Sequence, residues 1–229
     1  MIPVPEDADS ERNAGGSRSR YPHLRRAGRE LAVALRRYRD MSNTIVLGIV
    51  SGGVPVAHEV ASDLGRPLDF IIRRTLLVPR GPGSEVCAAS VAGVLVWPEE
   101  LRDRPPPVPS APLDYFLADA KTALEQRQRS CRGDRPPRNL NGQNAIVVDC
   151  GIRSGLTMRS AIEALRTRNP AQIIAAVPLG SVDGCASIAG VVDEFVCLTQ
   201  PEAFAHAGMF YHDFNRPADE QFQELLDGL

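Results

Sequence analysis

The chain has 229 residues, 43% hydrophobic and 24% charged, a composition that is ordinary for a globular protein and excludes a fibrous or wholly disordered chain. Its 26 basic and 28 acidic residues give a formal net charge of -2, and no apolar run approaches the roughly 20 residues of a membrane span, so we expect neither nucleic acid nor membrane as a partner. The five cysteines are widely spaced and lack any C-x-x-C pair, which argues against a zinc site or a disulfide framework and favours a reducing, cytoplasmic location.

The beginning of the chain differs from the rest. The first 20 residues are rich in Pro, Gly, Ser and charged residues and hold too few apolar side chains to pack. We expect residues 1–20 to form a flexible tail and residues 21–229 a single domain. Between residues 21 and 38, apolar residues recur at helical spacing with arginines on the other face, which predicts an amphipathic helix. The apolar positions are Leu24, Ala27, Leu31, Ala34 and Leu35.

Strands and helices are predicted to alternate in two groups along the rest of the chain. Residues 44–50 (TIVLGIV) form a continuous apolar, β-branched run, which is typical of a strand covered on both faces in a parallel sheet. The alternation predicts an α/β protein with an open, mainly parallel sheet and helices on both faces. The predicted strands are residues 44–50, 68–72, 145–149, 173–177 and 194–198, and the predicted helices are residues 54–64, 157–168 and 182–189.

A different kind of sequence separates the two groups. Residues 86–96 are rich in Val, Ala and Gly and predict a β-hairpin or edge strands outside the main sheet, as part of a small irregular hood. Residues 105–112 form a proline-rich spacer. Residues 113–128 predict a long polar helix before the second half of the sheet, and residues 131–142 predict a loop.

Two loops follow predicted strands, at the edge where an open parallel sheet binds ligands. The first, residues 51–53 (SGG), lacks bulky side chains, so a phosphate could approach its backbone. A tight strand-to-helix turn explains the same glycines equally well. The second, residues 149–157 (DCGIRSGLT), is more specific, because an acid ends the strand and small or hydroxyl residues open the helix.

The second loop offers groups that suit a phosphorylated sugar. Ser154, Gly155 and Thr157 can donate backbone N–H and hydroxyl hydrogen bonds to a phosphate at the positive end of the helix dipole. Arg153 can add a charge-assisted contact to the same phosphate. Asp149 can accept hydrogen bonds from sugar hydroxyls or coordinate a divalent cation.

Three common motifs do not occur in the sequence. There is no G-x-x-x-x-G-K-[ST], and neither glycine loop has the spacing G-x-G-x-x-G. Both GIVSG and GIRSG place the serine one residue too late for the nucleophile motif G-x-S-x-G. P-loop NTPases, dinucleotide-binding proteins and serine hydrolases are therefore disfavoured.

From residue 21 to the C-terminus, the chain resembles the type I phosphoribosyltransferase family, in particular its bacterial branch of predicted phosphoribosyltransferases. The resemblance is carried by VLGIVSGGVPVAHEVASDLGRPLDFIIRR, RPPRNLNGQNAIVVDCGIRSGLTMRSAIEALR and VCLTQPEAFAHAGMFYHDF. It implies a glycosyltransferase of nucleotide metabolism. Such an enzyme transfers a ribose 5-phosphate group from phosphoribosyl pyrophosphate to a base or related nucleophile, uses Mg²⁺ and releases pyrophosphate.

The resemblance also implies roles for the residues of the two loops. The 5-phosphate would be bound by Arg153, Ser154, Gly155, Leu156 and Thr157. Asp149 would act in catalysis, face the ribose hydroxyls and hold Mg²⁺. The pyrophosphate loop would comprise Ser51, Gly52 and Gly53, with Arg73 and the catalytic Arg74 as the basic pair beside it.

Further parts of the site are implied by the same resemblance. Residues 79–90 would form the family's mobile lid. Phe210, Tyr211 and Phe214 would line the base pocket, although core packing is an equally good explanation for aromatic side chains. The oligomeric state stays open, and a homodimer is the usual form of soluble homo-oligomers.

Three positions depart from the family pattern. Cys150 stands where the family has a second acid, Ser51 where it has an arginine, and Arg74 where it has a lysine. Losing one group that stabilises developing negative charge commonly costs about 3 kcal/mol in the transition state. Two hypotheses therefore stay open: an active phosphoribosyltransferase, and a catalytically weak or inactive member that binds a nucleotide or phosphosugar as a regulatory or interaction module. A reactive Cys150 thiol, activated by the helix N-terminus, is a less favoured alternative.

Overall fold

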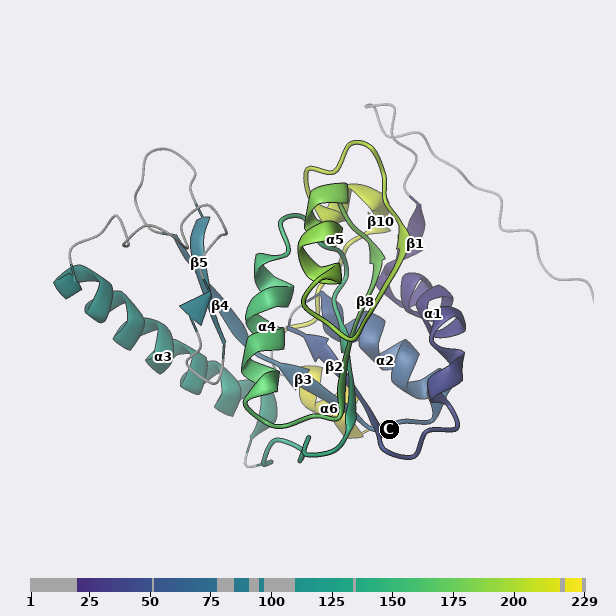
Figure 1. The fold of residues 1–229 in the computed structure, drawn as a ribbon, viewed down its shortest axis with the longest axis horizontal. Helices are drawn as coiled ribbons and strands as arrows, with labels where there is room; N and C mark the ends of the chain where they lie inside the picture. Colours follow the sequence, from purple (N-terminus) through teal and green to yellow (C-terminus); the bar gives the residue numbers. More distant parts are fainter. Residues whose placement is uncertain are drawn as a thin grey trace, which may run out of the picture.

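A five-stranded parallel sheet forms the centre of the computed structural model (Figure 1). The structure describes residues 20–50, 52–77, 85–90, 95–96, 110–133, 135–218 and 221–227. Several sequence predictions fall outside the described residues: the tail up to residue 19, Ser51, residues 79–84 of the expected lid and residues 105–109 of the spacer.

The main sheet has the strand order β3-β2-β7-β8-β9, and every neighbouring pair is parallel. Its strands are β2 (Thr44–Ile49), β3 (Leu68–Ile71), β7 (Asn144–Val148), β8 (Gln172–Leu179) and β9 (Glu194–Thr199). The connecting helices are α2 (Gly53–Leu64), α4 (Leu156–Arg166) and α5 (Val182–Ala189). The predicted open parallel sheet is confirmed, and its strands lie where the apolar runs predicted them.

Helices cover the sheet on both faces (Figure 1). Helices α1 (Leu24–Ala34) and α2 pack on one face, against Val46, Ile146 and Ile174. Helices α4 and α5 pack on the other face, against the residues that precede these three in the strands. Successive side chains of a strand point to opposite faces, so strands buried on both sides must be apolar throughout. The continuous run of residues 44–50 has this cause.

The hood is a second sheet of three antiparallel strands, β4 (Arg73–Leu77), β5 (Glu85–Ser90) and β6 (Leu95–Val96). The edge strands predicted in this region are confirmed. The long helix α3 (Ser110–Arg132) also exists, but it is longer than predicted at both ends. It begins inside the expected spacer because a proline in the first turn, here Pro112, is compatible with a helix. None of the described helices combines the length and apolar character that crossing a bilayer requires.

The C-terminal end of α3 is fixed to the main sheet by a buried ion pair. The guanidinium of Arg132 donates to Asp69 Oδ1 at 2.5 Å and to the carbonyl of Phe70 at 3.0 Å. Asp69 also accepts from the amides of Phe70 and Arg138, at 2.7 and 3.0 Å. The short helix α6 (Gln221–Asp227) packs nearby, with Phe222 in the same apolar cluster as Cys131.

The start of the domain corrects a prediction. Residues 21–23, expected to be helical, form the strand β1 (Tyr21–His23), which pairs in parallel with β10 (Tyr211–Asp213). The helix begins only at Leu24, because His23 is extended and its Nδ1 accepts from the amide of Arg26 at 3.1 Å, as an N-cap. The rings of Tyr21 and Tyr211 stack with centroids 5.5 Å apart. This pairing brings the two ends of the domain together.

Candidate active site

A cleft of about 400 Å³ opens at the carboxyl ends of β2 and β7. It gathers the loop after β7, the loop after β2, the first residue of the hood and the segment around β10. The lining residues are Val50, Gly52, Arg73, Asp149, Cys150, Gly151, Ile152, Arg153, Ser154, Gly155, Leu156, Thr157, Met158, Ala205, His206, Ala207, Gly208, Phe214 and Arg216. The structure thus brings together most of the residues that the sequence predicted for the site.

Asp149 lies directly after β7, half-buried at the base of the cleft. Its Oδ1 accepts a hydrogen bond of 2.7 Å from the amide of Cys150. Desolvation raises the pKa of the Asp149 carboxyl above its ordinary value, and Arg73 is the strongest of the groups that act against this shift. A ligand that donates hydrogen bonds to this carboxylate would therefore relieve part of its desolvation cost.

The glycines after β2 let the two loops approach closely. A Cβ on Gly53 would lie 2.5 Å from the carbonyl oxygen of Val148, and one on Gly52 would lie 2.7 Å from the Sγ of Cys150. Neither position has room for a side chain. Close packing of helix α2 therefore explains both glycines, while Gly52 also lines the cleft.

The loop before α4 has the geometry of an anion site. Gly155 is the N-cap residue of α4, and its φ of 77° is one that glycine adopts at little cost. Gly155 has no side chain to cap the helix, and the first-turn residues Leu156, Thr157 and Met158 line the cleft, so their amides are available to an anion there. The helix dipole adds positive potential at the same place.

Helix α5 braces this loop from behind. The hydroxyl of Ser181 donates to the carbonyl of Arg153. The hydroxyl of Ser187, which donates to the carbonyl of Gly184 at 2.8 Å, lies 3.4 Å from the carbonyl oxygen of Ser154. A Cβ on Gly155 would collide with the Ser187 hydroxyl. The loop conformation therefore depends on the position of α5.

Three arginines from separate parts of the chain line the cleft. Arg73 comes from the hood, Arg153 from the loop after β7, and Arg216 from the segment after β10. The guanidinium of Arg216 lies over the ring of Phe214, 4.6 Å from its centroid. Sequence reasoning missed Arg216 because it follows the last segment that carries the family resemblance. These cations favour an anionic ligand.

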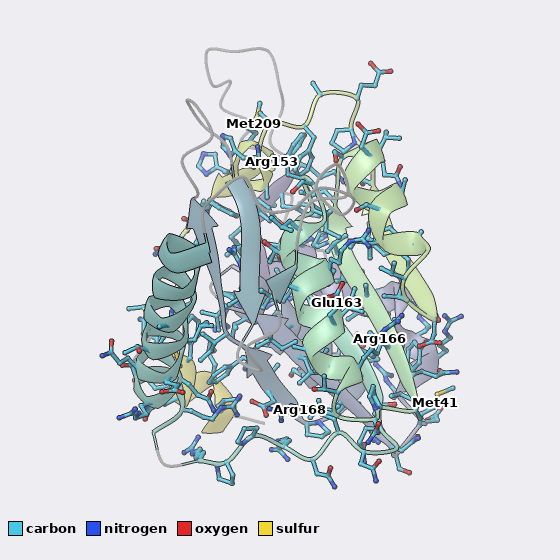
Figure 2. The ribbon with its side chains drawn as sticks, turned by 60° about the vertical axis from the view of Figure 1, so that its left-hand side comes forward. Met41, Arg153, Glu163, Arg166, Arg168 and Met209 are labelled. Atoms are coloured by element: carbon cyan, nitrogen blue, oxygen red, sulfur yellow. The ribbon has the colours of Figure 1, made fainter. Side chains whose placement is uncertain are left out.

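Figure 2 shows where Arg153 of the cleft lies relative to residues of α4 and of the opposite end of the molecule. Arg153 lies at the same end of the molecule as Met209, near β10, whereas Arg168 and Met41 lie at the opposite end. Arg74, expected to be catalytic, belongs to β4, and its side chain is outside the described part of the structure. It is not among the residues that line the cleft as described.

The three predicted aromatic residues divide into two groups. Phe214 lines the cleft, whereas Phe210 and Tyr211 are buried in the core on the α1 side of the sheet. The hydroxyl of Tyr211 donates to the carbonyl of Cys150 at 2.7 Å. Burial raises the pKa of Tyr211, so this hydroxyl stays protonated and holds the loop after β7. Core packing therefore describes Phe210 and Tyr211.

The structure argues against a reactive Cys150 thiol. Burial, with the charge of Asp149 as the next cause, raises the pKa of Cys150 well above its ordinary value. A nucleophilic cysteine needs the opposite shift. Cys150 instead fills the space beside Gly52, and its backbone holds Asp149 and Tyr211.

The donor set of the cleft limits how a metal could be held. Asp149 is the one carboxylate among the described lining residues, and no group of three or more His, Cys, Asp or Glu side chains that could hold a metal occurs in the described ranges. Mg²⁺ commonly binds through one or two carboxylates and completes its coordination with substrate phosphates and water. The cleft therefore fits a Mg²⁺ ion that arrives with its substrate.

The fold and cleft define an α/β protein in which an acid, a helix N-terminus and several arginines meet at the carboxyl edge of a parallel sheet. The chain belongs to the phosphoribosyl transferase domain family, whose model matches residues 19–188. The matched region contains the sheet up to α5, both loops and the hood.

Two relatives show how far the similarity extends. A Mycobacterium tuberculosis protein that is provisionally named a phosphoribosyl transferase is 35% identical over 201 residues, which are 88% of this chain and 45% of that protein. The chain thus spans less than half the length of this curated relative. The solved structure of the protein TT1426 from Thermus thermophilus is 31% identical, with a TM-score of 0.75 over 90% of this chain and 97% of that chain.

Proposed function

We propose that the cleft binds phosphoribosyl pyrophosphate, or a 5-phosphorylated ribose, and that the protein transfers the phosphoribosyl group to an acceptor base or related nucleophile. One observation carries this proposal. The carboxylate of Asp149, the first-turn amides of α4 and the guanidinium of Arg73 all line the same cleft. These groups match a ribose, its 5-phosphate and a pyrophosphate, in a family whose members are named for that reaction.

Each part of the substrate has a suitable partner. Residues 153–157 would bind the 5-phosphate through backbone amides, the hydroxyls of Ser154 and Thr157, and the charge of Arg153. Asp149 would accept hydrogen bonds from the ribose hydroxyls. Transfer breaks the bond between the anomeric carbon and the pyrophosphate oxygen, so negative charge grows on the pyrophosphate, where Arg73 would stabilise it.

Magnesium would be held by Asp149 together with oxygen atoms of the substrate. When bound, it would neutralise charge on the leaving pyrophosphate. The residues of the chain would supply the rest: they orient the sugar, exclude water and place cations around the phosphates.

We propose that these functions are retained despite the departures from the family pattern. Arg153 and Arg216 add positive charge to the cleft, which offsets the arginine that is replaced by Ser51. No observation favours the inactive binding module, so we propose the transferase. A cytoplasmic location agrees with the absence of a disulfide at the described cysteines Cys131, Cys150, Cys185 and Cys197. The homodimer stays a prediction.

Calorimetric titration with phosphoribosyl pyrophosphate, with and without Mg²⁺, tests the binding step. We expect saturable binding that Mg²⁺ strengthens. Pyrophosphate release across a panel of purine and pyrimidine bases then tests transfer. Absence of binding to phosphoribosyl pyrophosphate and to ribose 5-phosphate would overturn the proposal. Binding with no pyrophosphate release for any base would favour the inactive module.

A further inference from the structure

Two cysteines outside the proposed chemistry lie next to each other. Cys185 is on α5 and Cys197 is on β9, and their sulfur atoms are 3.7 Å apart. Eleven residues, which include the turn after α5, separate them in the sequence, so the pair has no C-x-x-C spacing. A disulfide requires the sulfurs to be about 2.05 Å apart. The observed separation is about 1.6 Å longer, so the two thiols are in contact but not bonded, and a movement of α5 toward β9 would bring them to bonding distance.

The surroundings give the two sulfurs different roles. Cys197 belongs to the edge strand of the main sheet and is partly exposed, whereas Cys185 is buried beneath it. The Cys185 thiol donates to the Cys197 sulfur, and this contact lowers the pKa of Cys197 while it raises that of Cys185. Cys197 is therefore the less buried residue of the pair and the one whose thiol is more readily ionised. A thiolate is the reactive form toward oxidants.

We propose that Cys185 and Cys197 form a reversible disulfide that controls the phosphate-binding loop in front of α4. This assigns a modification site to the face of the sheet that carries α4 and α5. The part of the proposal that concerns ligand binding rests on the function proposed above, whereas the disulfide itself does not.

A peroxide can supply the oxidising equivalents. The Cys197 sulfur attacks one oxygen of hydrogen peroxide, the O–O bond breaks, water leaves and Cys197 becomes a sulfenic acid. The Cys185 sulfur then attacks the Cys197 sulfur, the S–O bond breaks, and the hydroxyl leaves as a second water with the Cys185 proton. Two thiols are oxidised to one disulfide, and one peroxide is reduced to two waters. A dithiol such as dithiothreitol reverses the change by exchange.

Helix α5 connects the cysteine pair to the cleft. Cys185 lies one turn after Ser181, whose hydroxyl donates to the carbonyl of Arg153, and Gly184 packs directly under that carbonyl. The hydroxyl of Ser187, two residues after Cys185, donates to the carbonyl of Gly184 at 2.8 Å and lies 3.4 Å from the carbonyl oxygen of Ser154. Closing the disulfide moves the two sulfurs about 1.6 Å together, and α5 takes up part of that movement. The loop that presents the amides of α4 then loses its support.

The chemistry is tested first by mass. The reduced full chain is treated with one equivalent of hydrogen peroxide, and we expect an intact mass lower by two hydrogen atoms, a peptide that links Cys185 to Cys197, and recovery with dithiothreitol. Cys131 is the internal control, because it is buried in a different cluster and should remain a thiol. Cys197→Ser and Cys185→Ala should each abolish the linked peptide. Linkage to a different cysteine, or a sulfenic acid that never converts to a disulfide, overturns the proposal.

Control of the loop is tested by titrating ribose 5-phosphate into the reduced and the oxidised protein. Because a displacement of about 1 Å in a binding group can cost large factors, we expect the dissociation constant to rise about tenfold on oxidation and to return on reduction. In the Cys197→Ser variant, peroxide should leave the dissociation constant for ribose 5-phosphate unchanged. An oxidised protein with the disulfide and unaltered affinity overturns the control. If the reduced protein fails to bind ribose 5-phosphate, the proposed function fails, while the mass measurement still decides the disulfide.

Discussion

Two aspartates of the main sheet are held in opposite ways. Asp69 is buried in β3 and accepts hydrogen bonds from Arg132 and from the amides of Phe70 and Arg138. Asp149 follows β7, faces an open cleft and carries a pKa raised by desolvation. A carboxylate whose partners are all supplied by the protein stabilises the fold, whereas one that is desolvated and directed at a cleft is available to a ligand. The comparison distinguishes structural from functional acids, and each of the following variants tests one side of it.

The largest effect is expected at the structural acid. Arg132→Met leaves the Asp69 carboxylate buried without its guanidinium, which should lower the free energy of unfolding by about 3–5 kcal/mol, as measured by urea denaturation. Arg138→Met is the matched control, because Arg138 contributes its backbone amide and its side chain is exposed. That control should change the free energy by less than about 0.5 kcal/mol. Equal effects of the two variants would contradict a structural ion pair.

At the functional acid, binding should fall while the fold is retained. Asp149→Asn removes a charged acceptor for sugar hydroxyls, so the affinity for phosphoribosyl pyrophosphate should fall about 10- to 100-fold in calorimetric titrations. Glu163→Gln, midway along α4 in Figure 2, should bind as the unaltered protein does. An Asp149→Asn protein with unchanged affinity would show that the cleft does not use this acid.

The loop before α4 can be tested by comparing Gly155, its last residue, with Gly142, a glycine of similar conformation outside that loop. Gly155→Ala combines a positive φ of 77° with a collision at Ser187, whereas Gly142→Ala combines a φ of 70° with open space. Both should lose about 1–2 kcal/mol of stability from backbone strain. Gly155→Ala should also weaken ribose 5-phosphate binding by at least the same free energy, and Gly142→Ala should not. Equal affinities in the two variants would separate the loop from the ligand.

A smaller effect is expected at the exposed cation of the cleft. Arg216→Met should weaken phosphoribosyl pyrophosphate binding about two- to fivefold at low ionic strength, and the difference should shrink as salt is added. Arg166→Met serves as the control, since Arg166 is exposed at the C-terminal end of α4, at the opposite end of that helix from the cleft. Salt-independent loss of affinity in Arg216→Met would point to a packing role over Phe214 instead.

The smallest expected effect is on the pH dependence of stability. The pKa of Asp149 is raised in the folded protein, so its ionisation costs folding free energy as pH rises above about 4. Asp149→Asn removes this cost. The difference in unfolding free energy, variant minus unaltered protein, should therefore increase between pH 4 and pH 7 in parallel urea titrations. A difference that decreases over this range would mean that the folded protein stabilises the carboxylate.

Local patterns in the sequence were enough to predict the main sheet, its helices and the loop at residues 149–157. Strands such as residues 44–50 are buried on both faces, and helix α4 begins at a glycine after small residues, so both leave strong local signals. The long helix α3 was predicted too short because its ends depend on Pro112 and on the ion pair of Arg132.

Features that depend on distant contacts could not be predicted. The strand at Tyr21–His23 exists because it pairs with Tyr211–Asp213 at the other end of the chain. Arg216 enters the cleft from outside the segments that resemble the family. The adjacency of Cys185 and Cys197 follows from the packing of α5 on β9. In each case the cause is a tertiary contact, which no local sequence pattern encodes.

The most direct test of the proposed site is a crystal structure of the protein with ribose 5-phosphate bound. We predict the phosphate within hydrogen-bond distance of the amides of residues 155–158 and the ribose hydroxyls against the carboxylate of Asp149. A sugar phosphate bound elsewhere on the protein, or bound in the reverse orientation with its phosphate at Arg73, would contradict the assignment of the loop before α4 as the 5-phosphate site.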